Sequence, residues 1–187
     1  SESDHCPLAA IGEVYGGEQL RLLALYSSGY IALLEELPIA LRVHFNSLIE
    51  LTIIQLSPVA RQHVIDAVAA LPALQHLHLD VNHYEPRKNS MPQYIPKETL
   101  NQLVSLYLAG RLGQKSIVNF AELDPSVCSL QKLGLVFCTD GVEYLLSEAS
   151  LGLRANLHKL YLADKHDVLD QIDFTTFTTI ASFEKYN

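Results

Sequence analysis

Two histidines and an aspartate, spaced two residues apart, form the chain's best candidate for metal chemistry. His76, His78 and Asp80 occupy alternate positions, and His83 follows shortly after. All three would lie on one face of a strand, and imidazole and carboxylate groups are zinc ligands. Any alternating strand creates this spacing, however, so we expect a polar stripe and no stoichiometric zinc. The histidines would make the binding of a partner depend on pH.

Other patterns of catalytic residues are missing from the sequence. It contains no GxSxG, HExxH, GxGxxG or Walker-type loop, and no spacing of Ser, His and Asp that suggests a triad. The three cysteines, Cys6, Cys128 and Cys138, are too few and too scattered for a disulfide framework. We therefore predict that the chain is not an enzyme and that it holds neither a metal nor an organic cofactor.

The composition indicates a folded domain with a large core. The chain has 187 residues, of which 49% are hydrophobic and 18% charged, and its formal net charge is -8. The negative charge argues against a nucleic-acid partner, and no apolar run is long enough to cross a membrane. Because no signal peptide is visible, we expect an intracellular protein, cytoplasmic or nuclear. Since the only methionine is Met91, we expect a fragment of a longer chain.

An internal repeat predicts the elements that position these residues. The pattern apolar-x-x-apolar-x-apolar begins at residues 20, 48, 74, 103, 130 and 157, so successive copies start 26 to 29 residues apart. Spacing as constant as this is typical of repeat proteins. The six copies are Leu20–Leu25, Leu48–Ile53, Leu74–Leu79, Leu103–Leu108, Leu130–Leu135 and Leu157–Leu162.

The six copies resemble leucine-rich repeats, whose signature is L-x-x-L-x-L-x-x-N/C-x-L. Asn82 in the third copy and Cys138 in the fifth occupy the Asn/Cys position, where we expect Cys138 to be buried. The repeat length, with helical returns, is similar to that of an irregular ribonuclease-inhibitor-like class. The resemblance covers residues 20–165 and implies an α/β leucine-rich repeat solenoid. Such a fold has a curved parallel sheet on its concave face, and helices and loops on its convex face.

The fourth and sixth positions of each copy should face the core of this fold. Because strand side chains alternate, both leucines lie on one face, which is buried only when neighbouring strands stack in register. We therefore predict parallel strands centred near Leu23, Leu51, Leu77, Leu106, Leu133 and Leu160.

The segments between the strands show helical patterns of differing strength. Apolar spacing predicts helices over residues 58–71 and 141–150. Shorter helices are expected over 116–123 and over 31–37, the latter stopped by Pro38. Residues 83–99 contain three prolines, so we expect no helix there. This segment should instead project as a loop, which either carries function or is a tolerated insertion.

Both ends of the repeat array should be protected from solvent. We assign residues 1–19 to an N-terminal cap, with a helix over 8–14, or to a truncated preceding repeat. Residues 166–187 are assigned to a C-terminal return helix or cap. Open ends would allow the chain to associate with itself, because stacked repeats need caps.

The third, fifth and seventh positions of each copy should point to the concave face. Tyrosine and arginine at such positions are typical binding anchors, although each could also be an ordinary solvated residue. The predicted partner-binding residues are Tyr26, His76, His78, Asp80, Tyr107, Arg111, Lys132, Lys159 and Tyr161.

We expect the chain to recognise a protein partner through this face. The resemblance suits the repeat part of an intracellular immune-type receptor, where irregular repeats read a ligand. It also suits the substrate-recruiting repeats of an F-box-type ubiquitin ligase, or a regulator of a partner enzyme. The fold hosts many unrelated roles, so the repeats alone do not choose among these alternatives.

Overall fold

A computed structural model describes most of the chain. The residues whose structure it describes are 20–26, 31–54, 61–80, 94–110, 116–163, 172–173, 175, 177 and 182–186. The side chains of residues 31–36, 61 and 182–186 are outside this description. The helix expected over 8–14, most of the proline-containing segment 83–99, Arg111 and Asn82 also lie outside the described residues.

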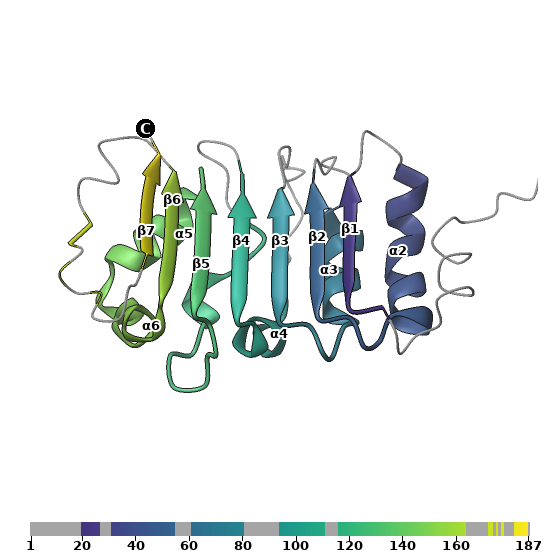
Figure 1. Ribbon diagram of the computed structural model, residues 1–187, viewed down its shortest axis with the longest axis horizontal. Coiled ribbons are helices and arrows are strands. Elements are labelled where there is room, and N and C mark those ends of the chain that lie inside the picture. The colour runs from purple at the N-terminus through teal and green to yellow at the C-terminus, as the bar shows by residue number, and fades with distance from the viewer. Residues whose placement is uncertain are drawn as a thin grey trace, which may run out of the picture.

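Seven parallel strands form a single sheet in which their spatial order is their order in the chain. Figure 1 shows them side by side, all pointing the same way, with β1 beside β2 and β7 at the other end. The strands are β1 (Leu22–Tyr26), β2 (Glu50–Ile54), β3 (His76–Asp80), β4 (Ser105–Ala109), β5 (Lys132–Val136), β6 (Lys159–Ala163) and β7 (Ser182–Tyr186).

The repeated leucines lie in register across the sheet, as predicted. Leu77 pairs with Leu51 on one side and with Leu106 on the other, and Leu133 pairs with Leu106 and Leu160. Each strand is centred one residue beyond the predicted leucine, at the fifth position of the copy. The prediction of parallel neighbours with aligned leucines is therefore confirmed.

One face of the sheet is the wall of the hydrophobic core. In β2, β3 and β4, buried residues alternate with half-buried ones, as expected when one face of a strand is covered. Leu51, Leu74 and Leu135 have no exposed surface. We call the opposite face, formed by the third, fifth and seventh positions of the copies, the strand face. Helices α3 and α5 lie behind the sheet in Figure 1, on the core side.

Helix α2 (Ile31–His44) continues through Pro38, so the prediction that this helix stops there is wrong. Proline in a helix interior costs about 3 kcal/mol. Beyond it, however, Leu41 is completely buried, and so is Phe45 directly after the helix. Full burial of each such side chain contributes about 1.5–3 kcal/mol, so the packing outweighs the lost backbone hydrogen bond.

Helix α3 (Arg61–Ala69) confirms the helix predicted over 58–71 for its described residues, and it ends two residues earlier than expected. Val64, Ala67 and Val68 are fully buried, as the apolar spacing of this segment indicates.

The helix predicted over 141–150 is confirmed up to Leu146, and a 3-10 turn occupies its last three residues. Helix α5 (Thr139–Leu146) ends at Ser147, whose backbone is extended, and is followed by the 3-10 turn η3 (Glu148–Ser150) and by helix α6 (Leu151–Asn156). The Ser147 hydroxyl donates to the Tyr144 carbonyl at 2.6 Å, and the Ser150 hydroxyl donates to the Ser147 carbonyl at 2.8 Å. Serine hydroxyls compete in this way with continuing helical hydrogen bonds.

Two further return segments differ from prediction. Residues 116–123 contain only the 3-10 turn η2 (Phe120–Glu122), because the Ser116 hydroxyl closes a local turn with the backbone of Val118. Helix α4 (Lys97–Gln102) occupies the end of the segment expected to be a loop. Pro96 stands at its N-cap, where its carbonyl oxygen accepts a hydrogen bond from the Leu100 N–H and its missing N–H interrupts no helical hydrogen bond.

Strand β7 falls within residues 166–187, where a return helix or a cap was expected. Its register aligns Phe183 with Leu160 and Lys185 with Leu162. Lysine at the position of the last leucine hides this strand from a search for the repeated pattern. In the part of the chain that the structure describes, no helix combines the length and the apolar character needed to span a membrane.

Candidate functional site

The strand register assembles the predicted binding positions into rows across the sheet. The third-position row brings Ser105 of β4 beside Lys132 of β5, and Lys132 beside Lys159 of β6. The fifth-position row runs through His78, Tyr107, Gly134 and Tyr161, on β3 to β6. Neighbouring strands lie about 4.8 Å apart, so residues from copies far apart in the sequence form one continuous surface.

Three aromatic rings contact one another in the fifth-position row. The ring centroids of His78 and Tyr107 are 4.2 Å apart, with an interplanar angle of 51°. The centroids of Tyr107 and Tyr161 are 5.8 Å apart at 34°, although these residues lie two strands apart. Aromatic pairs at such separations are favourable, so the rings are held together on a half-exposed surface.

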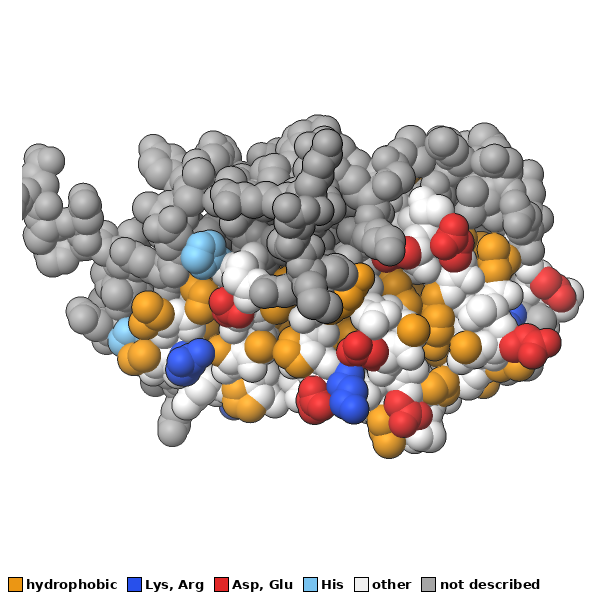
Figure 2. Space-filling model, turned by 180° about the vertical axis from the view of Figure 1, so that it is seen from behind, with side chains coloured by type: hydrophobic (Ala, Val, Ile, Leu, Met, Phe, Trp, Pro, Cys, Tyr) orange, Lys and Arg blue, Asp and Glu red, His pale blue; other side chains and the backbone are white. Residues whose placement is uncertain are grey.

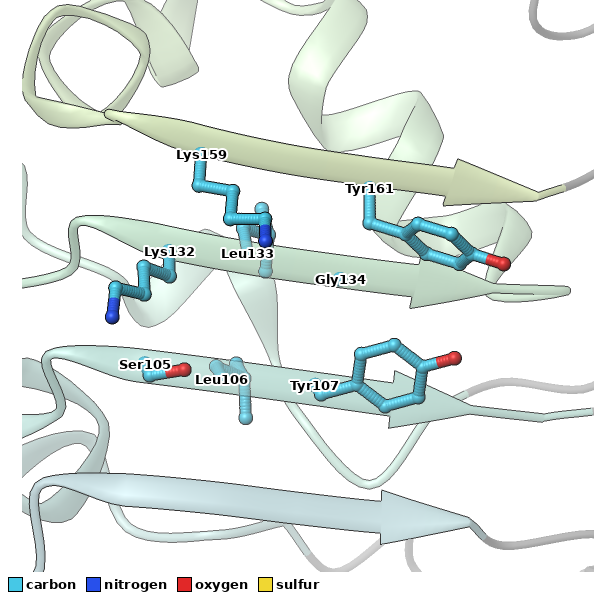
Figure 3. A pocket seen from close by; sticks show the side chains of 8 residues that line it. All are labelled: Ser105, Leu106, Tyr107, Lys132, Leu133, Gly134, Lys159 and Tyr161. Atoms are coloured by element: carbon cyan, nitrogen blue, oxygen red, sulfur yellow. The ribbon is translucent and has the colours of Figure 1, made fainter. Parts of the chain in front are cut away.

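Gly134 allows the two tyrosines to meet. A Cβ atom built on this glycine would lie 2.2 Å from Cδ2 of Tyr107, much closer than any real contact. The ring of Tyr107 therefore occupies the space that a side chain on β5 would fill. In Figure 3 Tyr107 and Tyr161 lie on the two strands that flank the strand with Gly134, and both rings lie near the arrowheads.

A hollow of about 190 Å³ lies beside these rings, over β4, β5 and β6. The two tyrosines lie at one end and the two lysines at the other, nearer the start of the strands (Figure 3). Both lysine side chains are exposed, whereas those of the tyrosines are half-buried. The hollow is lined by Ser105, Leu106, Tyr107, Lys132, Leu133, Gly134, Lys159 and Tyr161.

Burial shifts the titration of two aromatic groups on this face. It lowers the pKa of His78, against the opposing effect of the Asp80 and Glu50 carboxylates, which favour the charged imidazolium. Burial also raises the pKa of Tyr107, and Tyr161 and Asp80 raise it further. Both shifts favour the neutral form, so the aromatic row presents uncharged rings beside the two ammonium groups.

Five of the predicted partner-binding residues meet at one place. The structure brings together His78, Tyr107 and Tyr161 through ring contacts, and Lys132 and Lys159 through the sheet register.

The other predicted residues lie elsewhere or outside the description. His76 and Asp80 share the strand face of β3 with His78. Tyr26 is 72% exposed on β1, three strands away from Tyr107, so it belongs to a different part of the face. Arg111 is not among the described residues.

The metal and cysteine predictions concern positions close to this site. Among the residues that the structure describes, no three His, Cys, Asp or Glu side chains are grouped so that they could hold a metal ion. His83 lies outside those residues. Cys138 is buried, as predicted, and its Sγ is 3.6 Å from the carbonyl oxygen of Leu108 and 3.5 Å from that of Val136.

The predicted partner-binding residues did not include four residues that line the hollow, namely Ser105, Leu106, Leu133 and Gly134. Gly134 carries a visible signal, because it is the only glycine in the fifth-position row and stands between two tyrosines once the copies are aligned. The aligned row therefore indicates where a neighbouring aromatic ring has room to lie across the sheet.

The remaining surface is of a different character. On the described part of the opposite side of the molecule, hydrophobic, acidic and basic side chains are intermixed (Figure 2). The strand face, by contrast, separates aromatic groups from a pair of equal charges.

Comparisons of this chain with protein-family models, with curated proteins and with solved structures give no match.

Proposed function

We propose that this chain is a leucine-rich-repeat solenoid that binds a protein partner through its strand face. The observation that carries the proposal is the aromatic row of His78, Tyr107 and Tyr161, which contact one another on the face of the sheet that points away from the core. Aromatic side chains held in place lose little entropy on binding and bury a large area, so they serve as interface anchors.

The charges on the same face favour a protein rather than a nucleic acid. Glu50 and the partly buried Asp80 lie on β2 and β3, while Lys132 and Lys159 lie on β5 and β6. Such a face, with carboxylates on β2 and β3 and ammonium groups on β5 and β6, suits a partner with the complementary arrangement, and charge complementarity guides both orientation and association rate. A polyanion would meet repulsion from the carboxylates of β2 and β3.

Affinity capture with the full chain tests the proposal. The immobilised chain retains proteins from a cell extract, and mass spectrometry quantifies each one against a Tyr107→Ala variant and a Gln62→Ala variant. Gln62 is exposed on α3, on the core side of the sheet, and hydrogen-bonds Asp66. Loss of a central aromatic anchor costs about 1–3 kcal/mol, a roughly 5- to 150-fold loss of affinity.

The expected result is a partner whose retention falls with Tyr107→Ala and is unchanged with Gln62→Ala. Both variants should remain folded, because neither residue belongs to the core and Tyr107→Ala loses only its contacts with two neighbouring rings. A partner that ignores Tyr107→Ala and is lost with Gln62→Ala contradicts binding through the strand face.

A further inference from the structure

Lys132 and Lys159 occupy neighbouring positions at one end of the hollow, and their side chains extend in different directions (Figure 3). They are direct neighbours in the sheet register, and both are exposed. Like charges directly opposite one another on a sheet are destabilising, and neither lysine forms an ion pair with any residue that the structure describes. An anion seated between them would remove the repulsion and satisfy both ammonium groups.

The acidic residues on the strand face of β2 and β3 are too distant to fill this role. Glu50 lies three strands from Lys132, about 14 Å at the usual strand spacing. This exceeds the Debye length of about 8 Å at physiological ionic strength. Glu184 of β7 is in register with Tyr161, two positions beyond Ser182, which is in register with Lys159. In a chain with a net charge of -8, the lysine pair is a local site for an acidic group.

The tyrosines favour an apolar group on the ligand, at a fixed distance from the acidic group that the lysines favour. The lysine row and the tyrosine row are two positions apart along the strands, about 6.7 Å at the usual rise per residue. An extended peptide repeats its side chains on one side at the same interval. A segment running along β5 can therefore place the side chain of one residue between the lysines. The side chain two residues further along the segment then lies against the tyrosine rings.

We propose that this hollow binds an extended segment of a partner protein that carries an aspartate or glutamate and, two residues away, an apolar or aromatic residue. The carboxylate lies between Lys132 and Lys159, and the apolar side chain packs on Tyr107 and Tyr161. The inference rests on the proposed function and specifies which segment of the partner is recognised.

A carboxylate suits this site better than a phosphate. A carboxylate has two oxygens for two ammonium groups, whereas a phosphate dianion offers three strong acceptors. The backbone N–H groups of the interior strands β4 to β6 are already used in sheet pairing. The described residues that line the hollow include no arginine, the side chain that binds phosphate through paired hydrogen bonds.

A titration of the ¹⁵N-labelled chain, followed by ¹H–¹⁵N NMR, tests the proposal. The probe is the peptide acetyl-Gly-Ser-Glu-Ser-Phe-Ser-Gly-amide, which has the required spacing. We expect saturable shifts confined to residues 105–107, 132–134 and 159–161. The Kd should be on the order of 0.1–1 mM, because a small ligand in a shallow hollow makes few contacts.

Two variants with the same change in net charge show whether peptide binding depends on the lysine pair itself or on the charge of the whole chain. K132Q/K159Q should weaken binding of this peptide about tenfold or more, and it should remove most of the salt dependence between low and high ionic strength. R42Q/K97Q makes the same change in net charge at exposed positions on α2 and α4, so it should leave Kd within about twofold of the parent. Their NMR spectra report directly whether each variant is folded.

Three altered peptides test the chemistry of the ligand. Replacing Glu by Gln, or placing Glu and Phe next to each other, should weaken binding severalfold. The absence of NMR shifts at peptide concentrations up to several millimolar refutes the acidic-segment site. An equal loss of peptide affinity in K132Q/K159Q and R42Q/K97Q refutes it as well. A phosphoserine peptide that binds more tightly than the Glu peptide refutes the choice of a carboxylate.

The failure of this inference and of the proposed function are distinguishable. If the captured partner is lost with Tyr107→Ala but kept with K132Q/K159Q, and the Glu peptide does not bind, then the strand face binds a partner without an acidic anchor. If neither variant affects a captured partner, both the inference and the proposed function are wrong.

Discussion

Replacing Gly134 with alanine tests whether the glycine allows the aromatic residues of the fifth-position row to contact one another. The backbone of Gly134 is outside the left-handed region, so an L residue can adopt it without strain. The three atoms nearest to the added Cβ all belong to the Tyr107 side chain, the closest at 2.2 Å. The ring therefore has to withdraw by about 1 Å or more to reach an ordinary van der Waals distance.

The size of the effect follows from two opposing contributions. Withdrawal of Tyr107 disrupts its contacts with His78 at 4.2 Å and with Tyr161 at 5.8 Å. Each aromatic pair contributes about 0.5–1.5 kcal/mol, with the lower half of that range expected on a half-exposed face. Glycine to alanine at a compatible position stabilises by about 0.4–1 kcal/mol through the unfolded chain. Gly134→Ala alone should therefore lower the free energy of unfolding by between about 0 and 1.6 kcal/mol.

A double-mutant cycle separates the two contributions. Urea denaturation of the parent, Gly134→Ala, Tyr107→Ala and the double variant gives four free energies of unfolding. Once Tyr107 is truncated, Gly134→Ala should stabilise by about 0.4–1 kcal/mol, and the coupling energy should be about 1–2 kcal/mol. A coupling energy below about 0.3 kcal/mol, which is within the additivity of independent sites, would show that Tyr107 does not depend on the glycine.

Three further predictions concern the core, acid and metal. Leu106→Ala and Leu133→Ala, 1% and 2% exposed, should each lose about 2–5 kcal/mol in urea melts, and changes below about 0.5 kcal/mol would place them on the surface. Because the folded-state pKa of His78 lies below the ordinary value of 6.5, the folded state binds fewer protons than the unfolded one. Stability should then fall as pH drops below about 6.5, and a His78→Gln variant that keeps the parent's full pH dependence contradicts this assignment. Elemental analysis at neutral pH should find no stoichiometric zinc, whereas one zinc lost in a His76→Ala/His78→Ala variant would overturn that expectation.

The sheet was predictable because each of the six copies has the same buried positions. Leu51, Leu77, Leu106 and Leu133 meet one requirement, burial of one strand face, and six copies of the requirement leave little freedom of register. β7 escaped prediction because Lys185 stands where the pattern has leucine.

The return segments were less predictable because single contacts decide their boundaries. Helix α2 passes Pro38 since tertiary burial outweighs a local penalty, and α5 ends where Ser147 turns its hydroxyl to the helix carbonyls. Periodicity describes neither effect.

The candidate site is intermediate in this respect. Counting positions in the repeat gives the rows, and hence that Tyr107, Lys132 and Tyr161 share a face. The hollow depends on how far the tyrosine side chains lean over Gly134, which only three-dimensional packing determines.

The order of the strands has a consequence for local unfolding. Each strand pairs only with its neighbours in the chain, so opening at one end breaks few hydrogen bonds elsewhere, and amide exchange should become slower from the edges toward the centre. The hollow is built from residues 105–161, three strands that include none of the edge strands. Fraying of β1 or β7 should leave it intact, so the residues that bind a partner would be among the slowest of the sheet to exchange.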